Sequence, residues 1–355
     1  MSVSPNLNQT KTLTIAVTGL NANDNPGPGL GVIRALRAGF GENLRIIGLA
    51  YETLEPAIYL SDLVNKTYRI PYPTAGTEAL KERLQQIQEI EHIDVLIPNF
   101  DAELFNFIKL ERELLDIGIH TFLPTHQQLA ARDKVNLQAF GNNHGFDVPA
   151  SETIFSASEL DQMADKLGFP LVIKGKFYEA TVVQHIGEAY KAFYKLQAKW
   201  GLPIIVQQFI KGTEINIAGL ADGNGNALSV IPMRKMYITE KGKAWAGITI
   251  TDEKLINLAR EFAKASHWKG GFELEIMRDD KDALYIMEVN PRFPAWIYLS
   301  VAAGQNQPQL LVDLALGKPV QALTAYTAGK MFVRYAWDNI IDVAEFQKLS
   351  AFGEL

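Results

Sequence analysis

Two predicted strands near residue 280 carry acidic side chains at a spacing that suits a metal ion. By the two-residue period of a strand, Glu273 and Glu275 share the face opposite the apolar residues of the first strand. Folding the second strand back places Glu288 opposite Glu275, with Asn290 on the same face. Like charges so placed are destabilising unless a cation lies among them. Glu275, Glu288 and Asn290 are therefore predicted to hold a hard ion, Mg²⁺ or Mn²⁺; the alternative is a solvated strand face of alternating charge.

Positively charged side chains stand at the ends of other predicted elements. Arg292 follows the second acidic strand directly and suits a phosphate oxygen. Lys134 opens a predicted helix, and Lys174 ends a buried strand. Arg234 and Lys235 follow a strand-like run, and either side chain can bind an anion there. Taken alone, each of these last four residues is typical of an ordinary surface position.

The segment from Val206 to Glu214 joins a buried strand to a glycine and an acid. A segment that links two subdomains offers backbone amide and carbonyl groups to the edge of a base. The carboxylate of Glu214 can accept hydrogen bonds from ribose hydroxyls. A plain turn between two strands is the alternative for this segment.

The first 124 residues alternate predicted strands and helices, with strands at 13–20, 44–50, 93–98 and 119–123. This order predicts a small doubly wound α/β domain with a parallel sheet. A glycine turn, Gly27-x-Gly29-x-Gly31, follows the first strand, but its spacing does not match the dinucleotide fingerprint of nicotinamide enzymes. It is interpreted either as a tight strand-to-helix connection or as a helix start whose amides hold a small anion or carboxylate.

The composition bounds the function further. The chain has 355 residues, 47% hydrophobic and 21% charged, with a net charge of −6 and no cysteine. These values indicate a folded protein, and the length allows two domains or three small ones. The lack of cysteine excludes disulfides, thiolate metal sites and a cysteine nucleophile. No basic block points to a nucleic acid, and no apolar stretch points to a membrane or a secretory signal, so a cytoplasmic location is expected.

Taken in order, these residues resemble the signature of the ATP-grasp superfamily. The specific similarity is to its carbamoyl-phosphate-synthase-large-chain-like and biotin-carboxylase-like branch, and it covers roughly residues 12–320. The stretch Asn25-Pro-Gly-Pro-Gly29 also looks like that branch. The ordered set that carries the resemblance is Lys134, Lys174, Gln207 to Glu214, Glu275, Glu288, Asn290 and Arg292.

The resemblance implies an α/β fold in which an N-terminal Rossmann-like (pre-ATP-grasp) domain precedes a two-lobed α+β ATP-grasp. The domains are expected at 12–124 and 125–323, with a small lid lobe at about 148–209 and a C-terminal extension at 324–355. By the same resemblance the cofactors are ATP and Mg²⁺. Phosphates would be held by Lys134 and Lys174, adenine by Gln207 and the backbone of Gln208, Phe209 and Ile210, ribose by Glu214, and the metal by Glu275, Glu288 and Asn290.

The sequence departs from the family in the loop after Lys174. Members usually carry a glycine-rich loop there, but residues 175–181 contain one glycine, and backbone amides need glycines to curl around phosphate. The charged side chain of Lys176 can replace part of such a loop in binding phosphate. Lys176, Arg292 and Lys235 are the expected catalytic cations. Family members commonly carry an acid at the position of Gln207. The side-chain oxygen of Gln207 can still accept a hydrogen bond from the adenine amino group. A single grasp argues against carbamoyl phosphate synthesis or biotin carboxylation.

The function expected from the resemblance is an ATP-dependent carboxylate–amine ligase that acts through an acyl phosphate. Its substrate would be an amino acid, a small peptide or a precursor peptide, and a homodimer is left open. Substrate residues are expected at Asn21, Asp101, Glu103 and Arg234; the alternative for Asp101 and Glu103 is to cap the next helix. The alternative function is a nucleotide-binding regulatory or scaffold protein with a degenerate phosphate loop. A third hypothesis, a nicotinamide-dependent dehydrogenase, is supported by the glycine turn alone.

Overall fold

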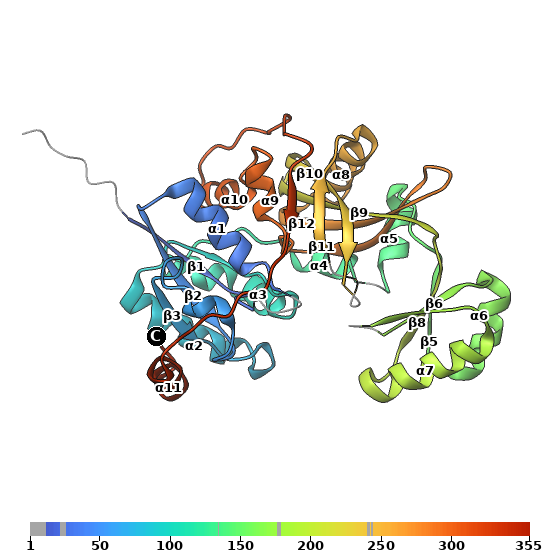
Figure 1. Cartoon of the computed structure of the whole chain (residues 1–355), viewed down its shortest axis with the longest axis horizontal. Helices are drawn as coiled ribbons and strands as arrows, with labels where there is room; N and C mark the ends of the chain where they lie inside the picture. The colour runs from blue at the N-terminus through green and yellow to red at the C-terminus, as the bar shows by residue number, and fades with distance from the viewer. Residues whose placement is uncertain (1–11, 22–25, 134, 176–178, 240–241, 243) are drawn as a thin grey trace, which may run out of the picture. The chain divides into compact units, whose positions relative to one another are not determined.

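The computed structural model describes residues 12–21, 26–133, 135–175, 179–239, 242 and 244–355. Lys134, Lys176 and Asn25 therefore lie outside the described residues. The chain divides into two compact units (Figure 1). Unit 1 comprises the chain up to His126 together with Ala218–Glu273 and Pro291–Leu355, and unit 2 comprises Gln127–Ile217 and Leu274–Asn290.

Unit 1 begins with a four-stranded parallel sheet in the order β3-β2-β1-β4. Its strands are β1 (Leu13–Val17), β2 (Leu44–Ala50), β3 (Lys66–Arg69) and β4 (Val95–Ile97). The helices that alternate with them are α1 (Gly29–Phe40), α2 (Thr77–Glu91) and α3 (Leu104–Asp116). Strands β1, β2 and β4 are nearly continuous apolar runs, as expected where helices cover both faces of a parallel sheet.

The sequence predicted this sheet with two errors. Strand β3 was missed because it is short and begins and ends with a cation. The strand predicted at 119–123 is reduced to one parallel bridge between His120 and Val95. Alternation identifies long buried strands better than short edge strands, which have little apolar pattern to read.

A six-stranded sheet follows, in the order β13-β12-β9-β10-β11-β14. Its strands are β9 (Gly212–Asp222), β10 (Ala227–Ile238), β11 (Ala244–Thr249), β12 (Lys269–Asp279), β13 (Leu284–Asn290) and β14 (Met331–Val333). Helix α8 (Glu253–Ser266) packs against β10 and is capped by Asp252, whose carboxylate accepts from the amides of Lys254 and Leu255. Helices α9 (Tyr298–Ala302) and α10 (Gln307–Ala315) complete this part of unit 1.

Unit 2 contains an antiparallel sheet in the order β5-β8-β6-β7. The strands are β5 (Ser151–Ile154), β6 (Leu171–Gly175), β7 (Ala180–Val183) and β8 (Ile204–Gln208). Helices α6 (Leu160–Leu167) and α7 (Ile186–Trp200) pack on one face, where Leu171, Ile173, Ile204 and Val206 form the core. Two shorter helices precede the sheet, α4 (His126–Ala131) and α5 (Leu137–His144). The helix that the sequence predicts near Lys134 begins later, because α5 starts only at Leu137.

The C-terminal segment extends the four-stranded parallel sheet and the six-stranded sheet. Strand β14 pairs with β11, and the chain then leads to α11 (Val343–Phe352), which lies beside β3 in Figure 1. The last residues pair with β3: Thr67 and Leu355 exchange backbone hydrogen bonds of 2.8 and 2.9 Å, and the amide of Arg69 donates to the carbonyl of Gly353. Leu349 of α11 is fully buried. In the described part of the chain, no helix is both long and apolar enough to cross a membrane.

Candidate nucleotide and ligase site

Two of the three predicted metal ligands lie together in unit 2. The turn between β12 and β13 is built by Asp279, whose carboxylate accepts from the amides of Lys281 and Ala283. The hairpin brings the side-chain amide of Asn290 to Glu275, with 3.2 Å between Nδ2 and Oε1. Glu288 is partly exposed on β13, two residues before Asn290 and so on the same face.

The donor chemistry of this group fits a hard divalent cation. It offers carboxylate and amide oxygens only, the ligands that Mg²⁺ prefers. Among the described residues there is no cluster of three or more acidic, histidine or cysteine side chains able to hold a metal by themselves. A cation here would therefore take part of its shell from water or phosphate, as Mg²⁺ usually does.

Gln207 and Lys174 share one face of the unit 2 sheet. Gln207 of β8 lies directly opposite Val172 of β6, and Lys174 opposite Ile205. Because residues two apart on a strand point the same way, Lys174 and Gln207 lie on the face opposite the helices. Gln207 is only 6% exposed, and its Oε1 is buried with no hydrogen-bond partner among the described residues. A buried acceptor in this state costs free energy until a donor reaches it.

One backbone donor of the segment predicted to meet adenine is used within the chain. The amide of Gln208 donates to the carbonyl of Ala150 at 2.8 Å, so this donor is already used within the chain. Phe209, which is partly exposed, and Ile210, which is buried, supply the remaining backbone groups of the predicted segment. Glu214 is partly exposed on β9, and its role toward ribose stays a prediction.

Arg292 is held by two carboxylates of unit 1. Its Nε lies 2.6 Å from Oδ1 of Asp101, and its Nη1 lies 3.7 Å from Oε2 of Glu273. Glu273 is buried and also accepts a 2.9 Å hydrogen bond from Nε1 of Trp296. Asp101, expected to hold a substrate amine, thus pairs with the predicted catalytic arginine. Reasoning from sequence missed Glu273 and Trp296 as its supports, because nothing in their spacing shows that they meet Arg292.

Glu103 lies inside unit 1 rather than at its surface. It is 1% exposed and accepts from the hydroxyls of Thr18 and Tyr51 and from the amides of Asn99 and Phe100. Burial raises the pKa of Glu103 to about 7 although these four donors oppose the shift. These contacts match the alternative from sequence, in which Glu103 secures the turn before α3.

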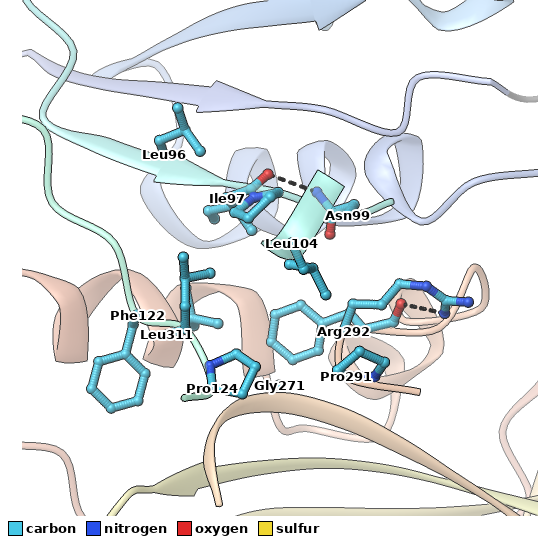
Figure 2. A pocket seen from close by; sticks show the side chains of 13 residues that line it. Leu96, Ile97, Asn99, Leu104, Phe122, Pro124, Gly271, Pro291, Arg292 and Leu311 are labelled. Carbon is cyan, nitrogen blue, oxygen red and sulfur yellow. Dashed lines mark hydrogen bonds between the residues drawn. The ribbon is translucent and has the colours of Figure 1, made fainter. Parts of the chain in front are cut away.

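Asn99 and Arg292 line a small cavity at the carboxyl end of β4 (Figure 2). The side chain of Asn99 is 1% exposed. Its Nδ2 donates to the carbonyl of Ile97 at 2.9 Å, while its Oδ1 has no partner in the described part of the chain. The cavity measures about 20 Å³. That volume holds about one water molecule, so it is not a pocket for a carboxylate substrate.

Arg234 and Lys235 are neighbours on β10 and lie opposite Ile248 and Gly247 of β11. Successive residues of a strand point to opposite faces, so one face of this sheet receives only one of these two cations. Arg234 is exposed, whereas Lys235 is partly exposed and its Nζ lies 3.4 Å from the carbonyl of Gly242.

The glycine turn of unit 1 is explained by close packing of the backbone. The amide of Gly27 donates to the carbonyl of Asn21 at 2.6 Å, and that of Gly29 to the carbonyl of Gly19 at 3.0 Å. A Cβ atom on Gly29 would lie 2.2 Å from the carbonyl oxygen of Thr18. These contacts favour the interpretation as a tight strand-to-helix connection, and they place Asn21 within it.

Comparison with known proteins defines the class. A family described as ATP-grasp in the biosynthetic pathway with Ter operon matches residues 202–337. The biotin carboxylase of Campylobacter jejuni, solved as a complex with β,γ-ATP, superposes with a TM-score of 0.69 at 17% identity, covering 90% of this chain and 74% of that chain. The chain is thus similar to an ATP-grasp family over residues 202–337, and its fold is similar to that of a biotin carboxylase.

The sequence relatives point to the branch within the superfamily. The carbamoyl phosphate synthase large chain of Agathobacter rectalis is 23% identical over 293 residues, covering 76% of this chain and 25% of that protein. The D-alanine–D-alanine ligase of Bordetella pertussis is 33% identical over 104 residues, covering 28% of this chain and 32% of that protein. The chain thus spans about a quarter to a third of these relatives, and its similarity lies in the branch with carbamoyl phosphate synthase and biotin carboxylase.

Proposed function

We propose that the protein is an ATP- and Mg²⁺-dependent ligase that joins a carboxylate to an amine through an acyl phosphate, with release of ADP and phosphate. The observation that carries the nucleotide site is the buried, unpartnered Oε1 of Gln207 on the same sheet face as Lys174. An adenine amino group is a donor of the kind that this acceptor lacks. The similarity to a D-alanine–D-alanine ligase supports the amine half of the proposal.

The residues predicted to bind phosphate, adenine, ribose and metal have the following places in this proposal. Lys174 and Lys134 bind phosphate oxygens, Phe209 and Ile210 meet adenine through their backbone, and Glu214 binds the ribose. The metal is held by Glu275, Glu288 and Asn290 and neutralises charge on the phosphates. Arg292 and Lys235, with Lys176, bind the phosphoryl group or the acyl phosphate as cations.

The chemistry needs little from the protein beyond position and charge. An oxygen of the substrate carboxylate attacks the γ-phosphorus; that P–O bond forms as the bond to the β,γ-bridging oxygen breaks, and ADP leaves with the electron pair. The amine nitrogen then attacks the acyl carbon, the C–N bond forms, the C–O bond to phosphate breaks, and the amine loses a proton to solvent. Carboxylates are ionised at neutral pH, so the first step needs no protein base. Orienting the reactants and neutralising charge supply most of the rate.

The substrate class is also a proposal, supported by the similarity to a D-alanine–D-alanine ligase. We propose an amino acid, a small peptide or a precursor peptide as the source of the carboxylate and an amine as the acceptor. Asp101 beside Arg292 gives an anionic and a cationic group within 2.6 Å of each other, which suits a substrate that carries both charges.

Release of ADP and phosphate from Mg-ATP, measured against a panel of amino acids and peptides with hydroxylamine present, tests the reaction. A carboxylate that raises ADP release and yields a hydroxamate supports the ligase and names the acid. Formation of AMP and pyrophosphate would overturn the acyl-phosphate mechanism. Tight ATP binding without any turnover would favour the regulatory alternative, which the glycine-poor stretch 175–181 motivates.

Calorimetric titration of Mg-ATP into the Glu288→Ala variant tests the metal site. We expect the variant to fold and to lose most of its affinity, because one of two carboxylates that balance the cation is gone. Glu261→Ala, which removes an exposed carboxylate from α8, is the matched control and should bind as the parent does. Equal affinity in the parent and Glu288→Ala would refute the assignment.

A further inference from the structure

Aromatic side chains gather where three strands of the parallel sheet end. Tyr51 follows β2 directly, Tyr72 comes three residues after β3, and Phe100 comes three residues after β4. The rings of Tyr51 and Tyr72 are stacked with their centroids 5.7 Å apart, and the ring of Phe100 is tilted against that of Tyr51 at 6.1 Å. Tyr51 is partly exposed, whereas Tyr72 and Phe100 are 50% and 40% exposed. These three residues form an aromatic cluster in which two half-exposed rings pack on a more buried one.

The aromatic cluster lies at the edge of the sheet where open α/β sheets bind ligands. Strands β2 and β3 lie on one side of β1 and β4 on the other, so the strand order reverses between β1 and β4. Glu103 spans this point, because its carboxylate accepts from the hydroxyl of Thr18 after β1 and from the hydroxyl of Tyr51 after β2. Ligands of such sheets bind outside the carboxyl ends of the strands at the point of reversal. The position therefore favours a binding role for the exposed rings.

Carboxylates beside the aromatic cluster give it an excess of negative charge. Glu52 is exposed, and its carboxylate accepts a 2.9 Å hydrogen bond from the hydroxyl of Tyr72. Glu55 is buried and accepts from the amides of Tyr51 and Glu52 at 2.6 and 3.1 Å. Among the described residues, no lysine, arginine or histidine forms an ion pair with Glu52, Glu55 or Glu103. A surface with several carboxylates and no paired cation attracts positive charge.

The pKa values of this region agree with a deficit of positive charge. The hydrogen bond to Glu52 raises the pKa of Tyr72, and Arg69 opposes that shift only in part. Burial raises the pKa of Glu55, and burial also raises the pKa of Glu103 to about 7. A cation bound at the rings would stabilise the ionised forms of both carboxylates and lower their pKa values.

We propose that the aromatic cluster and the carboxylate of Glu52 bind an organic cation, an ammonium or guanidinium group, of the substrate that supplies the amine. The faces of tyrosine and phenylalanine rings attract such cations, and a carboxylate beside them adds a charge-assisted hydrogen bond. Asp101, which follows Phe100, pairs with Arg292 at 2.6 Å, so the cluster leads to the cation expected to bind the acyl phosphate. The inference rests on the proposed ligase, to which it adds a basic amino acid or a diamine as the class of amine substrate.

Calorimetric titration tests the cation site separately from the reaction, both without nucleotide and with the nonhydrolysable analogue adenylyl imidodiphosphate. The probes are two pairs in which one member lacks the charge: L-arginine with L-citrulline, and L-lysine with L-norleucine. At least one basic amino acid should bind, and its neutral partner should bind about tenfold more weakly, because it makes neither the cation–π contact nor the ion pair. No binding of either basic amino acid, or equal binding of its neutral partner, would overturn the proposal.

Substitution of the exposed side chains locates the site. Tyr72→Ala and Glu52→Gln should each weaken binding of the basic amino acid about fivefold, since each removes one contact to the cation. Tyr72→Phe keeps the ring and should retain more affinity than Tyr72→Ala. Tyr194→Ala, which removes a tyrosine of α7 that is 58% exposed, is the matched control and should bind as the parent does. If Tyr72→Ala and Glu52→Gln both bind as the parent does, the cation lies elsewhere and the assignment is refuted.

Release of ADP distinguishes failure of this inference from failure of the proposed reaction. If ADP forms as readily with a neutral amine as with the basic one, the ligase stands and the cation site is wrong. If a basic amino acid binds selectively and Tyr72→Ala weakens it, but no substrate raises ADP release, the cation site stands and the ligase is wrong. Because Tyr72 and Glu52 are exposed, their variants should fold, which circular dichroism checks.

Discussion

Replacing Glu103 by glutamine should change how the stability of unit 1 depends on pH. Burial raises the pKa of Glu103 to about 7 from an ordinary value of 4.5, so the folded state binds a proton here more tightly than the unfolded chain. The stability gained from that proton is complete below about pH 4.5 and is lost as the pH rises through 7. At 1.36 kcal/mol per pKa unit, the loss amounts to at most about 3 kcal/mol.

The measurement is the free energy of unfolding in urea at several pH values from 5 to 8, for the parent and for Glu103→Gln. The amide of glutamine stays neutral, and its oxygen can still accept from the amides of Asn99 and Phe100. The parent's stability minus that of the variant should fall as the pH rises, by up to about 3 kcal/mol. Tryptophan fluorescence, to which the buried Trp268 and Trp296 of unit 1 contribute, reports the unfolding.

A control and a refuting result define this test. Glu82→Gln changes an exposed residue of α2. The difference in free energy of unfolding between the parent and this variant should not fall as the pH rises. A flat difference for Glu103→Gln, or one that grows with pH, would refute the reasoning. It would show that the four hydrogen-bond donors around this carboxylate outweigh the effect of burial.

Three further substitutions test the site and the fold. Gln207→Leu should weaken Mg-ATP binding about tenfold in a calorimetric titration without lowering thermal stability, because it removes a buried acceptor that has no partner in the free protein; a clear loss of stability would contradict this. Asp101→Ala should lower the rate of ADP formation about tenfold at unchanged Mg-ATP affinity, since it frees Arg292 to leave its position; an unchanged rate would remove Asp101 from the site. Gly29→Ala should cost about 1–3 kcal/mol in urea unfolding, because its Cβ would meet the carbonyl of Thr18; parent-like stability would mean that the turn can open.

Much of the fold could be predicted because its signals are local. Buried strands such as β1 and β2 are apolar runs, and α8 begins at a capping aspartate where the pattern predicts it. The approach of Asn290 to Glu275 was predicted because a hairpin relates residues through its turn alone. The short edge strand β3 has no such pattern, and its partner in the C-terminal segment is almost 300 residues away, so local reasoning did not find it.

The parts of the site that could not be predicted depend on contacts between distant segments. Nothing local indicates that Asp101, after β4, meets Arg292, after β13, or that Trp296 supports Glu273. Nor does the sequence show that the side chain of Glu103 is buried. An acid in the first turn of a helix has the same sequence pattern whether it is exposed or buried. These contacts depend on where the ends of separate strands converge, which a sequence pattern does not specify.

The charge around Arg292 limits how that residue can act. One guanidinium stands beside two carboxylates, those of Asp101 and Glu273, so the group as a whole does not attract an anion strongly. Glu273 is buried and bound to Trp296, and removing it from the pair would leave a charge without compensation, whereas Asp101 is partly exposed. If the proposed function holds, an arriving carboxylate or phosphate should exchange with Asp101 rather than with Glu273. Such an exchange would release the Asp101 carboxylate at the moment of binding, where it could receive the ammonium group of the proposed substrate that carries both charges.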